Sequence, residues 1–282
     1  MKKKKEEKEF IIKKRLGQNF LKNDGICKKI AIAADVKGAA VMEIGPGFGA
    51  LTKELLKQAD FVFAIEKDEQ LILPLKQKFG LNSRIKIINA DFLEVDLKKL
   101  VEENRLKEKL HICANLPYYI TTPIIIKILS NKQFFKTATI MVQKEVAKRL
   151  TTKPGEKGCS SISVFVHYFS EPKILMNVSR GSFFPVPMVE SSVIKLTMKD
   201  EKIYNVEDEE FFFKMVRLAF SQRRKMLIGL MVKGFNIEKE KMSVILKRNG
   251  LKENVRVQEI SLLKLAAISN EIHRIIKQKE YG

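Results

Sequence analysis

The stretch ICANLPYYITTP, residues 112–123, ends a strand-like apolar run in an amide, a proline and two aromatic residues. Open parallel sheets bind their ligands outside the carboxyl ends of the strands. Pro117 restricts the backbone at this point and donates no hydrogen bond. A polar and aromatic junction between a strand and a helix therefore predicts a binding site, provided that the surrounding chain forms such a sheet.

Strand-like and helix-like segments alternate around this junction. Seven apolar runs predict strands, at residues 40–45, 61–66, 84–90, 109–115, 137–143, 161–169 and 191–198. Segments with helical spacing lie between the first five runs, whereas no long helix separates the last two. This order predicts an α/β fold with a doubly wound, Rossmann-like sheet of seven strands, mostly parallel with one antiparallel strand.

The pattern changes after residue 200, where the remaining segments have helical spacing and no strand is predicted. We therefore expect a small all-helical C-terminal domain, residues 201–282, after an α/β domain that comprises residues 16–200. Residues 1–15 are rich in lysine and are expected to form a flexible basic arm.

The chain is strongly basic, with a formal net charge of +20 from 53 Lys and Arg against 33 Asp and Glu. The excess is spread over the arm and both predicted domains, so it is not a basic tail on a neutral protein. Such a charge attracts polyanions, either nucleic acid or an anionic membrane surface.

The cysteines and histidines indicate neither a disulfide framework nor a metal site. Cys27, Cys113 and Cys159 are far apart and odd in number, and the three histidines do not cluster. The apolar run near the N-terminus is too short for a signal peptide, and no run approaches 18 apolar residues. We therefore expect a cytoplasmic protein that binds no metal and does not cross a membrane.

The sequence EIGPGFGALT, residues 43–52, follows the first predicted strand and opens a helix. Gly45, Gly47 and Ala50 satisfy the nucleotide-binding pattern G-x-G-x-x-G/A, in which glycine lets the backbone approach a ligand closely. Glu66 ends the second predicted strand, where a carboxylate can accept hydrogen bonds from both hydroxyl groups of a ribose. These features predict a ribose-bearing cofactor and leave NAD and S-adenosylmethionine open.

Two residues favour a cationic cofactor that lacks phosphate groups. Glu43 stands inside the first strand, where dinucleotide-binding folds normally have apolar residues, and Pro46 removes one donor from a pyrophosphate site. Asp91 follows the third strand, where an acid can accept a hydrogen bond from an adenine amino group. Because Asp is also common in turns and helix caps, Asp91 supports this interpretation only together with the other residues.

Asn115 and Leu116 offer two hydrogen-bond acceptors, a side-chain amide oxygen and a backbone carbonyl. The exocyclic amine of a nucleic-acid base is a poor nucleophile, because its lone pair is delocalised into the ring. Two acceptors can each take one N–H, hold the nitrogen in a more tetrahedral shape and aim its lone pair at a methyl donor. Tyr118 offers a flat face on which an extruded base can stack. The junction therefore predicts methylation of a base amine without a general base.

Eight segments together resemble one enzyme family. They are RLGQNFL (15–21), EIGPGFGALT (43–52), AIEKD (64–68), NADF (89–92), NLPYYITTPI (115–124), MVQKEVAKRL (141–150), FFPVPMVESSVIKL (183–196) and AFSQRRKML (219–227). From about residue 13 onward the chain resembles the small-subunit (16S) ribosomal RNA adenine N6,N6-dimethyltransferases, which use S-adenosylmethionine.

The resemblance implies dimethylation of the N6 atoms of two adjacent adenines in a hairpin loop near the 3′ end of small-subunit rRNA. It implies action late in ribosome assembly, on rRNA within the pre-30S particle, by a monomeric cytoplasmic enzyme.

The resemblance also implies roles for individual residues. For the cofactor, Asn19 and Leu21 would lie over it, Gly45 would contact its amino-acid part, Glu66 its ribose and Asp91 its adenine. At the target base, Asn115 would bridge cofactor and amine beside Leu116 and Pro117, Tyr118 would stack on the base, and Phe183 would close its other side. Met188 stands where the family usually has Lys, which puts a nearby phosphate contact in doubt.

The stretch QRRK, residues 222–225, is expected to begin a helix of the second domain. Three adjacent cations would oppose the helix dipole there, and a phosphate backbone would offset that repulsion. We therefore predict that Arg223, Arg224 and Lys225 contact rRNA, while the base pocket selects the target.

Three other functions have to be weighed. A large-subunit rRNA adenine methyltransferase of the macrolide-resistance type shares the first domain's motifs, but FFPVPMVESSV and AFSQRRKML favour the small-subunit type. A non-catalytic ribosome-assembly or transcription factor on this fold could lose Asn115, Pro117, Tyr118 and Glu66, which are all present. NAD-dependent oxidoreduction would need an acid or base near a hydride site, and the sequence offers no candidate.

Overall fold

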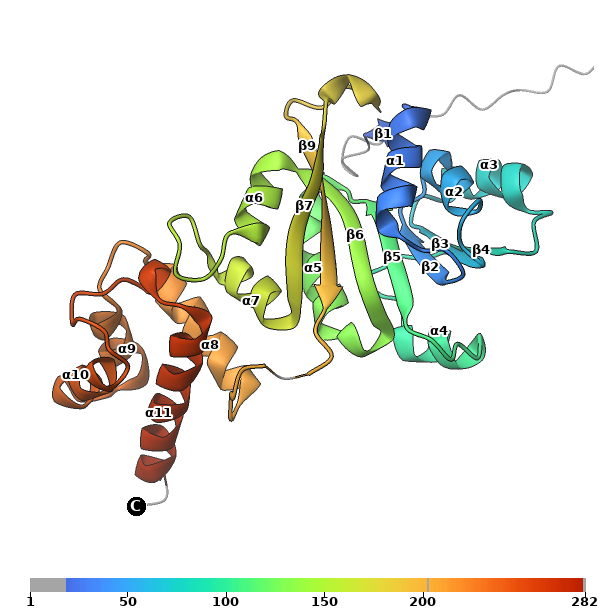
Figure 1. Cartoon of the computed structure of the whole chain (residues 1–282). Coiled ribbons are helices and arrows are strands. Elements are labelled where there is room, and N and C mark those ends of the chain that lie inside the picture. Colours follow the sequence, from blue (N-terminus) through green and yellow to red (C-terminus); the bar gives the residue numbers. More distant parts are fainter. Residues whose placement is uncertain (1–18, 202, 281–282) are drawn as a thin grey trace, which may run out of the picture. The chain divides into compact units, whose positions relative to one another are not determined.

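The computed structural model describes residues 19–201 and 203–280 (Figure 1). The predicted basic arm, residues 1–15, lies outside these residues. The described part divides into two compact units: residues up to Lys144 together with Leu175–Lys195, and Glu145–Ile174 together with Leu196 onward. This division groups residues 145–174 with the C-terminal helices, whereas the sequence pattern alone suggests one boundary near residue 200.

Seven strands form one sheet in the order β4–β3–β2–β5–β6–β9–β7. Their bounds are β2 Ala40–Ile44, β3 Phe61–Glu66, β4 Ile85–Asn89, β5 Leu110–Asn115, β6 Phe135–Gln143, β7 Ser170–Val178 and β9 Ser191–Met198. The pairs β2–β3, β3–β4, β2–β5 and β5–β6 are parallel. The predicted sheet, mostly parallel with one antiparallel strand, is confirmed.

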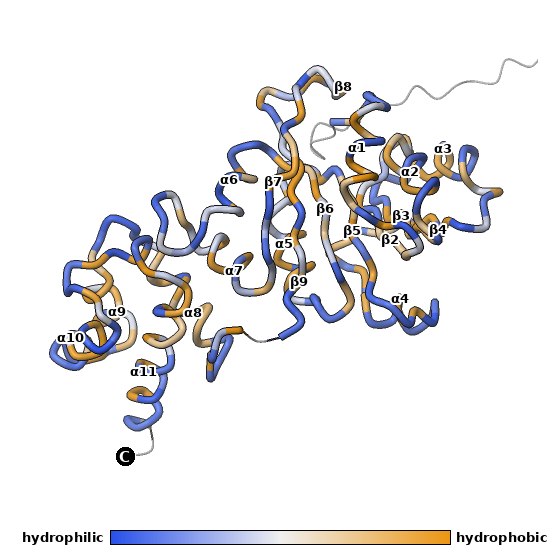
Figure 2. Tube along the Cα trace, viewed as in Figure 1, coloured by the Kyte–Doolittle hydropathy of each residue, from blue (hydrophilic) through white to orange (hydrophobic). Residues whose placement is uncertain are grey.

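The central strands are apolar because helices cover both faces of a parallel sheet. Nearly every residue of β2, β3 and β5 is buried, and the tube along β5 is largely orange in Figure 2. The helices of the first unit are α1 Asp24–Ala34, α2 Ala50–Leu55, α3 Glu69–Phe79, α4 Leu97–Glu103 and α5 Thr121–Ser130. Side-chain oxygens of Asn23, Asp68 and Asp96 cap three of them and fix where they begin.

The prediction of a strand at residues 161–169 is wrong, because this segment forms helix α7, Ser161–Phe169. Apolar and polar residues alternate there, and valine and aromatic residues favour strands, so the local pattern is misleading. Ser160 and Ser163 form a reciprocal capping box, which satisfies donors at the helix start. The preceding helix is α6, Lys144–Thr151.

The seventh strand is instead β7, Ser170–Val178, which the sequence pattern does not reveal. This strand lies at one edge of the sheet and contains Pro172 and several polar residues. Edge strands tolerate proline and polar residues, because one side of their backbone pairs with no neighbouring strand. Its composition therefore lacks the apolar run that marks the central strands.

A two-stranded ribbon joins segments that are far apart in the sequence. Strand β1, Phe20–Leu21, pairs antiparallel with β8, Phe183–Phe184, so that Phe20 faces Phe184 and Leu21 faces Phe183. Leu21 and Phe183 are buried in the core between α1, α2 and the sheet, and Phe183 is 0% exposed. Phe184, one residue further along, is 58% exposed. Side chains of neighbouring residues thus point to opposite faces of the ribbon.

The C-terminal part of the second unit consists of α8 Glu209–Ser221, α9 Leu227–Phe235, α10 Lys239–Arg248 and α11 Leu262–Glu280. Among the residues described after 200, none forms a strand, as predicted for this region. Its core contains Phe212, Met231, Leu246 and Leu265, which pack with Val164 and Tyr168 of α7.

Replacement of Phe183 by Ala should lower the free energy of unfolding by about 3–5 kcal/mol, since it removes a fully buried aromatic ring and leaves a cavity. Urea denaturation followed by circular dichroism measures this loss. The matched variant Phe184→Ala should change the same free energy by less than about 1 kcal/mol, because that ring is mostly exposed. Equal losses in the two variants would contradict the assignment of the two phenylalanines to opposite faces.

Candidate active site

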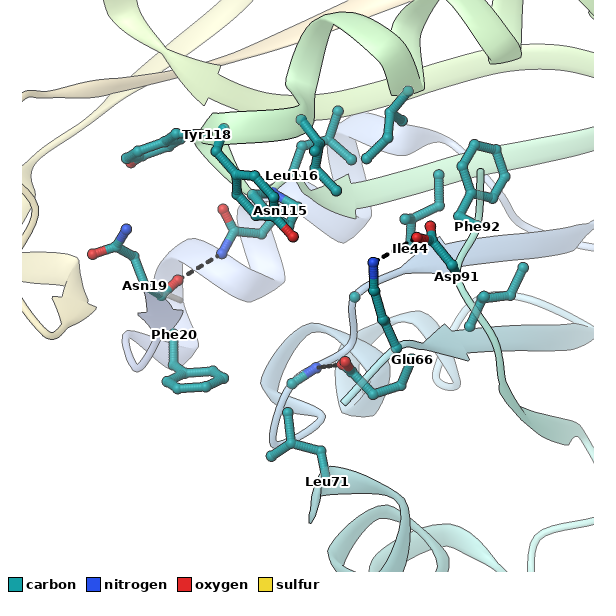
Figure 3. Close-up of a pocket in the computed structure, with 18 of the residues that line it drawn as sticks. Asn19, Phe20, Ile44, Glu66, Leu71, Asp91, Phe92, Asn115, Leu116 and Tyr118 are labelled. Atoms are coloured by element: carbon teal, nitrogen blue, oxygen red, sulfur yellow. Dashed lines mark hydrogen bonds and ion pairs between the residues drawn. The ribbon is translucent and has the colours of Figure 1, made fainter. Parts of the chain in front are cut away.

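The carboxyl ends of β4, β3, β2 and β5 meet at one edge of the sheet and surround a cavity that opens to solvent, with about 780 Å³ of empty space when the solvent at its mouth is included (Figure 3). Its lining includes the predicted site residues Asn19, Gly45, Glu66, Asp91, Asn115, Leu116, Pro117 and Tyr118. The strand order explains this grouping, because adjacent parallel strands end at the same edge.

The glycine loop after β2 adopts backbone conformations that favour glycine. Gly45 and Gly47 have φ angles of 68° and 59°. A Cβ atom on Gly47 would lie 2.9 Å from the Phe20 ring, so the loop and strand β1 approach each other too closely for any larger residue. A Cβ on Gly45 would meet nothing within 4 Å, which leaves open space over this part of the loop.

Glu66, at the end of β3, holds the glycine loop through its side chain. Its carboxylate accepts hydrogen bonds from the backbone N–H groups of Gly47, at 3.1 Å, and Asp68, at 2.8 Å. Burial raises the pKa of Glu66, and these two hydrogen bonds oppose that rise. Each oxygen accepts one of these N–H groups, and an ionised carboxylate has further lone pairs for ligand hydroxyl groups.

Asp91, after β4, forms an ion pair that the sequence does not predict. One carboxylate oxygen lies 2.6 Å from the ammonium of Lys67, and the other accepts the N–H of Leu93 at 2.9 Å. Burial alone would raise the pKa of Asp91, but the bonds from Lys67 and Leu93 outweigh it, so the pKa lies below its ordinary value. Asp91 is therefore an ionised acceptor at the cavity wall.

Asn115, the last residue of β5, is oriented by the N-terminal segment. Its side-chain N–H donates to the carbonyl oxygen of Asn19 at 2.9 Å (Figure 3). This bond uses the donor end of the amide and leaves the oxygen end, Oδ1, for other partners. Within the described part of the chain, no hydrogen bond is donated to Oδ1 or to the carbonyl oxygen of Leu116. The side-chain oxygen of Asn115 and the backbone carbonyl of Leu116 are therefore two neighbouring acceptors that can bind further donors.

Tyr118 follows in the short helical turn η2, Tyr118–Ile120, which leads into α5. Its hydroxyl bonds to the hydroxyl of the fully buried Ser191 at 2.7 Å, so the ring is fixed between β5 and the start of β9. Burial raises the pKa of Tyr118 and keeps the phenol neutral. Pro117 lines the cavity, and its carbonyl accepts the hydroxyl of Thr121 at 3.0 Å.

Two predicted site residues do not line the cavity. Leu21 and Phe183 point into the core instead, because they occupy the inner face of the β1–β8 ribbon. Sequence reasoning missed several residues that do line it: Phe20, Ile44, Ile65, Lys67, Leu71, Phe92, Tyr119, Ile120 and Ile124. Ile44, Ile65 and Phe92 lie at or just after strand ends, where the sequence pattern could have found them, whereas Phe20, Leu71 and Ile124 lie in β1, α3 and α5.

A scan against family models matches residues 9–274 to the ribosomal RNA adenine dimethylase model. The chain belongs to the ribosomal RNA adenine dimethylase family. It is accordingly an S-adenosylmethionine-dependent methyltransferase.

Relatives of this dimethylase match over most of its length. It is 41% identical over 266 residues to a protein of Alkaliphilus oremlandii named ribosomal RNA small subunit methyltransferase A, covering 94% of this chain and 93% of that protein. A protein of the same name from Oceanobacillus iheyensis is 38% identical over 269 residues, with 94% and 92% covered.

Two solved structures share the fold of the dimethylase. A dimethyladenosine transferase from Plasmodium falciparum has a TM-score of 0.72 and 26% identity, with 90% of this chain and 98% of that chain covered. The 23S rRNA methyltransferase ErmE has a TM-score of 0.70 and 25% identity, with 90% and 100% covered.

The prediction that QRRK begins a helix is wrong. Helix α8 ends at Ser221, and residues 222–225 form the exposed turn before α9. Basic residues directly after a helix carboxyl end interact favourably with its dipole, so the argument that a phosphate must offset a repulsion does not hold. Exposure of Arg223, Arg224 and Lys225 still leaves them accessible to a polyanion.

No helix of the described residues is long and apolar enough to span a membrane. A search of the same residues finds no group of three or more His, Cys, Asp or Glu side chains that could hold a metal ion.

Glu43 lies behind the glycine loop and is 1% exposed. Its carboxyl accepts the hydroxyl hydrogen of Thr52 in α2 at 2.6 Å and so joins the two ends of the loop. Burial raises the pKa of Glu43 to about 8, and the Thr52 hydrogen bond opposes this rise. The dimethylase therefore carries a largely protonated acid behind its glycine loop at neutral pH.

The stability of the dimethylase should decrease between about pH 4.5 and pH 8 relative to a Glu43→Gln variant. Across this window the folded chain keeps a proton on Glu43 that the unfolded chain has released, so the slope is negative, up to about 1.4 kcal/mol per pH unit. Urea denaturation of both proteins at several pH values measures the difference. A difference that is independent of pH would show that Glu43 titrates normally in the folded chain.

Proposed function

We propose that this chain transfers methyl groups from S-adenosylmethionine to the N6 atoms of two adjacent adenines in a hairpin loop near the 3′ end of small-subunit rRNA. The observation that carries the proposal is the hydrogen bond from the Asn115 amide to the Asn19 carbonyl. It directs the donor end of the amide away, so that Oδ1 and the neighbouring Leu116 carbonyl are left as a pair of acceptors.

The residues present fit S-adenosylmethionine. Gly45 leaves open space over the loop for its amino-acid part, and Glu66 offers carboxylate lone pairs to its ribose. Ile65, Phe92 and Ile124 give the cavity an apolar wall suited to an adenine, with Asp91 as the acceptor for its amino group. Asn19 and the backbone of Leu21 would cover the ligand from β1. When bound, the cofactor supplies an electrophilic methyl group on a sulfonium.

The chain's own groups prepare the target nitrogen. The two N6 hydrogens of the adenine would donate to Asn115 Oδ1 and to the Leu116 carbonyl, which draws the nitrogen toward a tetrahedral shape. Tyr118, held by Ser191, would stack on the base and fix its plane. No general base is needed, because the alkylated nitrogen is acidic enough to lose its proton to water.

Phe183 was predicted to close the other side of the base, but it is fully buried in the core. A direct contact would require the ribbon to open. We therefore assign Phe183 to the core and no longer to the base, and the Phe183→Ala variant tests this burial through stability.

The small subunit is favoured as the target over the large subunit. Relatives at 38–41% identity are named small-subunit methyltransferases, whereas the large-subunit enzyme ErmE is 25% identical. The segments at 183–196 and 219–227 resemble the small-subunit type as well. We further propose that the chain acts as a cytoplasmic monomer on the pre-30S particle, consistent with a net charge of +20.

Asn115→Ala should lower the rate of methyl transfer roughly 10²-fold or more, because the target amine loses one of its two acceptors. Binding to unmethylated small subunits should remain, since phosphate contacts elsewhere carry most of the affinity. Single-turnover transfer of labelled methyl groups and a sedimentation assay measure the two properties. A variant that methylates normally would show that the amide does not position the amine.

The target itself can be mapped directly. Unmethylated small subunits incubated with the chain and labelled S-adenosylmethionine should gain label on two adjacent adenines near the 3′ end of the rRNA. Label in large subunits only would support methylation of large-subunit rRNA instead.

Charge reversal at Arg223, Arg224 and Lys225 should weaken small-subunit binding at least about tenfold, because phosphate contacts dominate such affinity. Affinity for S-adenosylmethionine should not change. A control reverses Lys98, Lys99 and Lys107, three exposed lysines that precede β5 and do not line the cavity. If both triple variants lose affinity equally, net charge and not this turn governs binding.

A further inference from the structure

The β1–β8 ribbon presents an aromatic side chain beside the cavity that no part of the proposed mechanism uses. Phe184 is directly opposite Phe20 in the antiparallel register. Side chains of directly paired residues project from the same face of a ribbon. Because Phe20 lines the cavity, Phe184 lies on the cavity side as well, whereas Phe183 and Leu21 fill the core on the other side.

Phe184 is paired in the ribbon with Phe20, which is itself in contact with another aromatic residue. The Phe48 and Phe20 rings are in contact, with centroids 4.8 Å apart, and Phe184 faces Phe20 across the ribbon. Figure 3 shows the Phe20 ring at the margin of the cavity, on the side away from Asp91. Phe184 is 58% exposed, so its ring is accessible on the face of the ribbon that it shares with Phe20.

The residues around Phe184 suit a single-stranded nucleic acid. Val186 and Met188 are also exposed in the segment that follows it, so the surface is apolar as well as aromatic. Lys22, two residues beyond Phe20, is exposed, and its backbone N–H donates to Ser182 across the ribbon at 2.9 Å. A stacking face with a cation nearby is the arrangement that binds unpaired nucleotides, through the base and the phosphate respectively.

The substrate supplies a base for this surface. If two adjacent adenines are methylated, as proposed above, one occupies the cavity while the other lies unpaired beside it. A base that leaves its stack loses stacking energy, and a flat aromatic face outside the cavity restores part of it.

We propose that Phe184 is a stacking platform for the unpaired base next to the adenine in the cavity, with Lys22 near the phosphate of that nucleotide. This inference rests on the proposed function and adds a second nucleotide subsite to it. It assigns Phe184, not Phe183, as the ring that the RNA touches.

The test replaces one of the two adjacent adenines by 2-aminopurine in rRNA reconstituted into small subunits. 2-Aminopurine lacks the 6-amino group, so the remaining adenine is the methylation substrate and the fluorescent base reports on its neighbour. Binding of the unaltered chain should quench the fluorescence several-fold through stacking. Phe184→Leu should lose most of this quenching, and Phe184→Tyr should keep it.

Kinetics separate the platform from the chemistry. Phe184→Leu should raise KM for small subunits roughly tenfold, the effect of losing one stacked base. It should leave kcat and the dissociation constant of S-adenosylmethionine unchanged. Leu81→Ala, which trims an exposed apolar residue between α3 and β4 and outside this surface, is the control and should change neither quenching nor KM.

Equal quenching by the unaltered chain and Phe184→Leu would overturn the inference, as would equal KM values for Phe184→Leu and Leu81→Ala. Failure of the proposed function would be distinct, because the unaltered chain would then transfer no methyl group to these adenines.

Discussion

The hydrogen bond between the Asn115 side chain and the Asn19 carbonyl is the interaction on which the site depends. An amide has a donor end and an acceptor end, and only the acceptor end can draw a hydrogen from a target amine. The bond to Asn19 fixes which end faces away, and it does so from a segment 96 residues distant in sequence. Asn19 in turn immediately precedes β1, whose pairing with β8 keeps it in place. The Asn115 side chain at the end of β5 is thus oriented through the β1–β8 ribbon and not by its own strand.

Glu43, Glu66 and Asp91, the acids in or behind the cavity wall, differ in pKa because their hydrogen-bond and charge partners differ. Glu43, buried behind the loop with a hydroxyl donor, is stabilised in its protonated form, and Asp91 is ionised beside Lys67. Glu66 lies between these extremes, since burial and two backbone donors act in opposite directions on its pKa. The net negative charge of the site is therefore much smaller than a count of carboxyl groups suggests. Most lysines and arginines of the described residues are exposed, where their charge can attract a polyanion without acting strongly on the buried acids.

Much of the fold and of the site could be predicted from the sequence, because both follow from local patterns and one rule of topology. The apolar runs at residues 61–66, 84–90 and 109–115 predict three strands, and parallel pairing brings their carboxyl ends together. The pattern failed at residues 161–169, where alternation favoured a strand but a capping box and packing stabilise α7. It also failed for the Lys67–Asp91 ion pair and for the burial of Phe183. Both depend on contacts between distant segments, and a family motif does not specify such contacts in one particular chain.

The two adjacent phenylalanines of β8 show how a core contact can determine an exposed one. Side chains alternate along a strand, so a shift of register by one residue would exchange Phe183 and Phe184. Burial of Phe183 against Leu21 opposes that shift, since an exchanged register would move a large apolar ring from the core into solvent. The backbone bond from Lys22 to Ser182 extends the pairing by one more position. The burial of Phe183 thus determines the face of the ribbon on which its neighbour Phe184 lies. For this reason the effects of substitutions at 183 and 184 have to be separated by stability and by substrate binding, although both residues are phenylalanine.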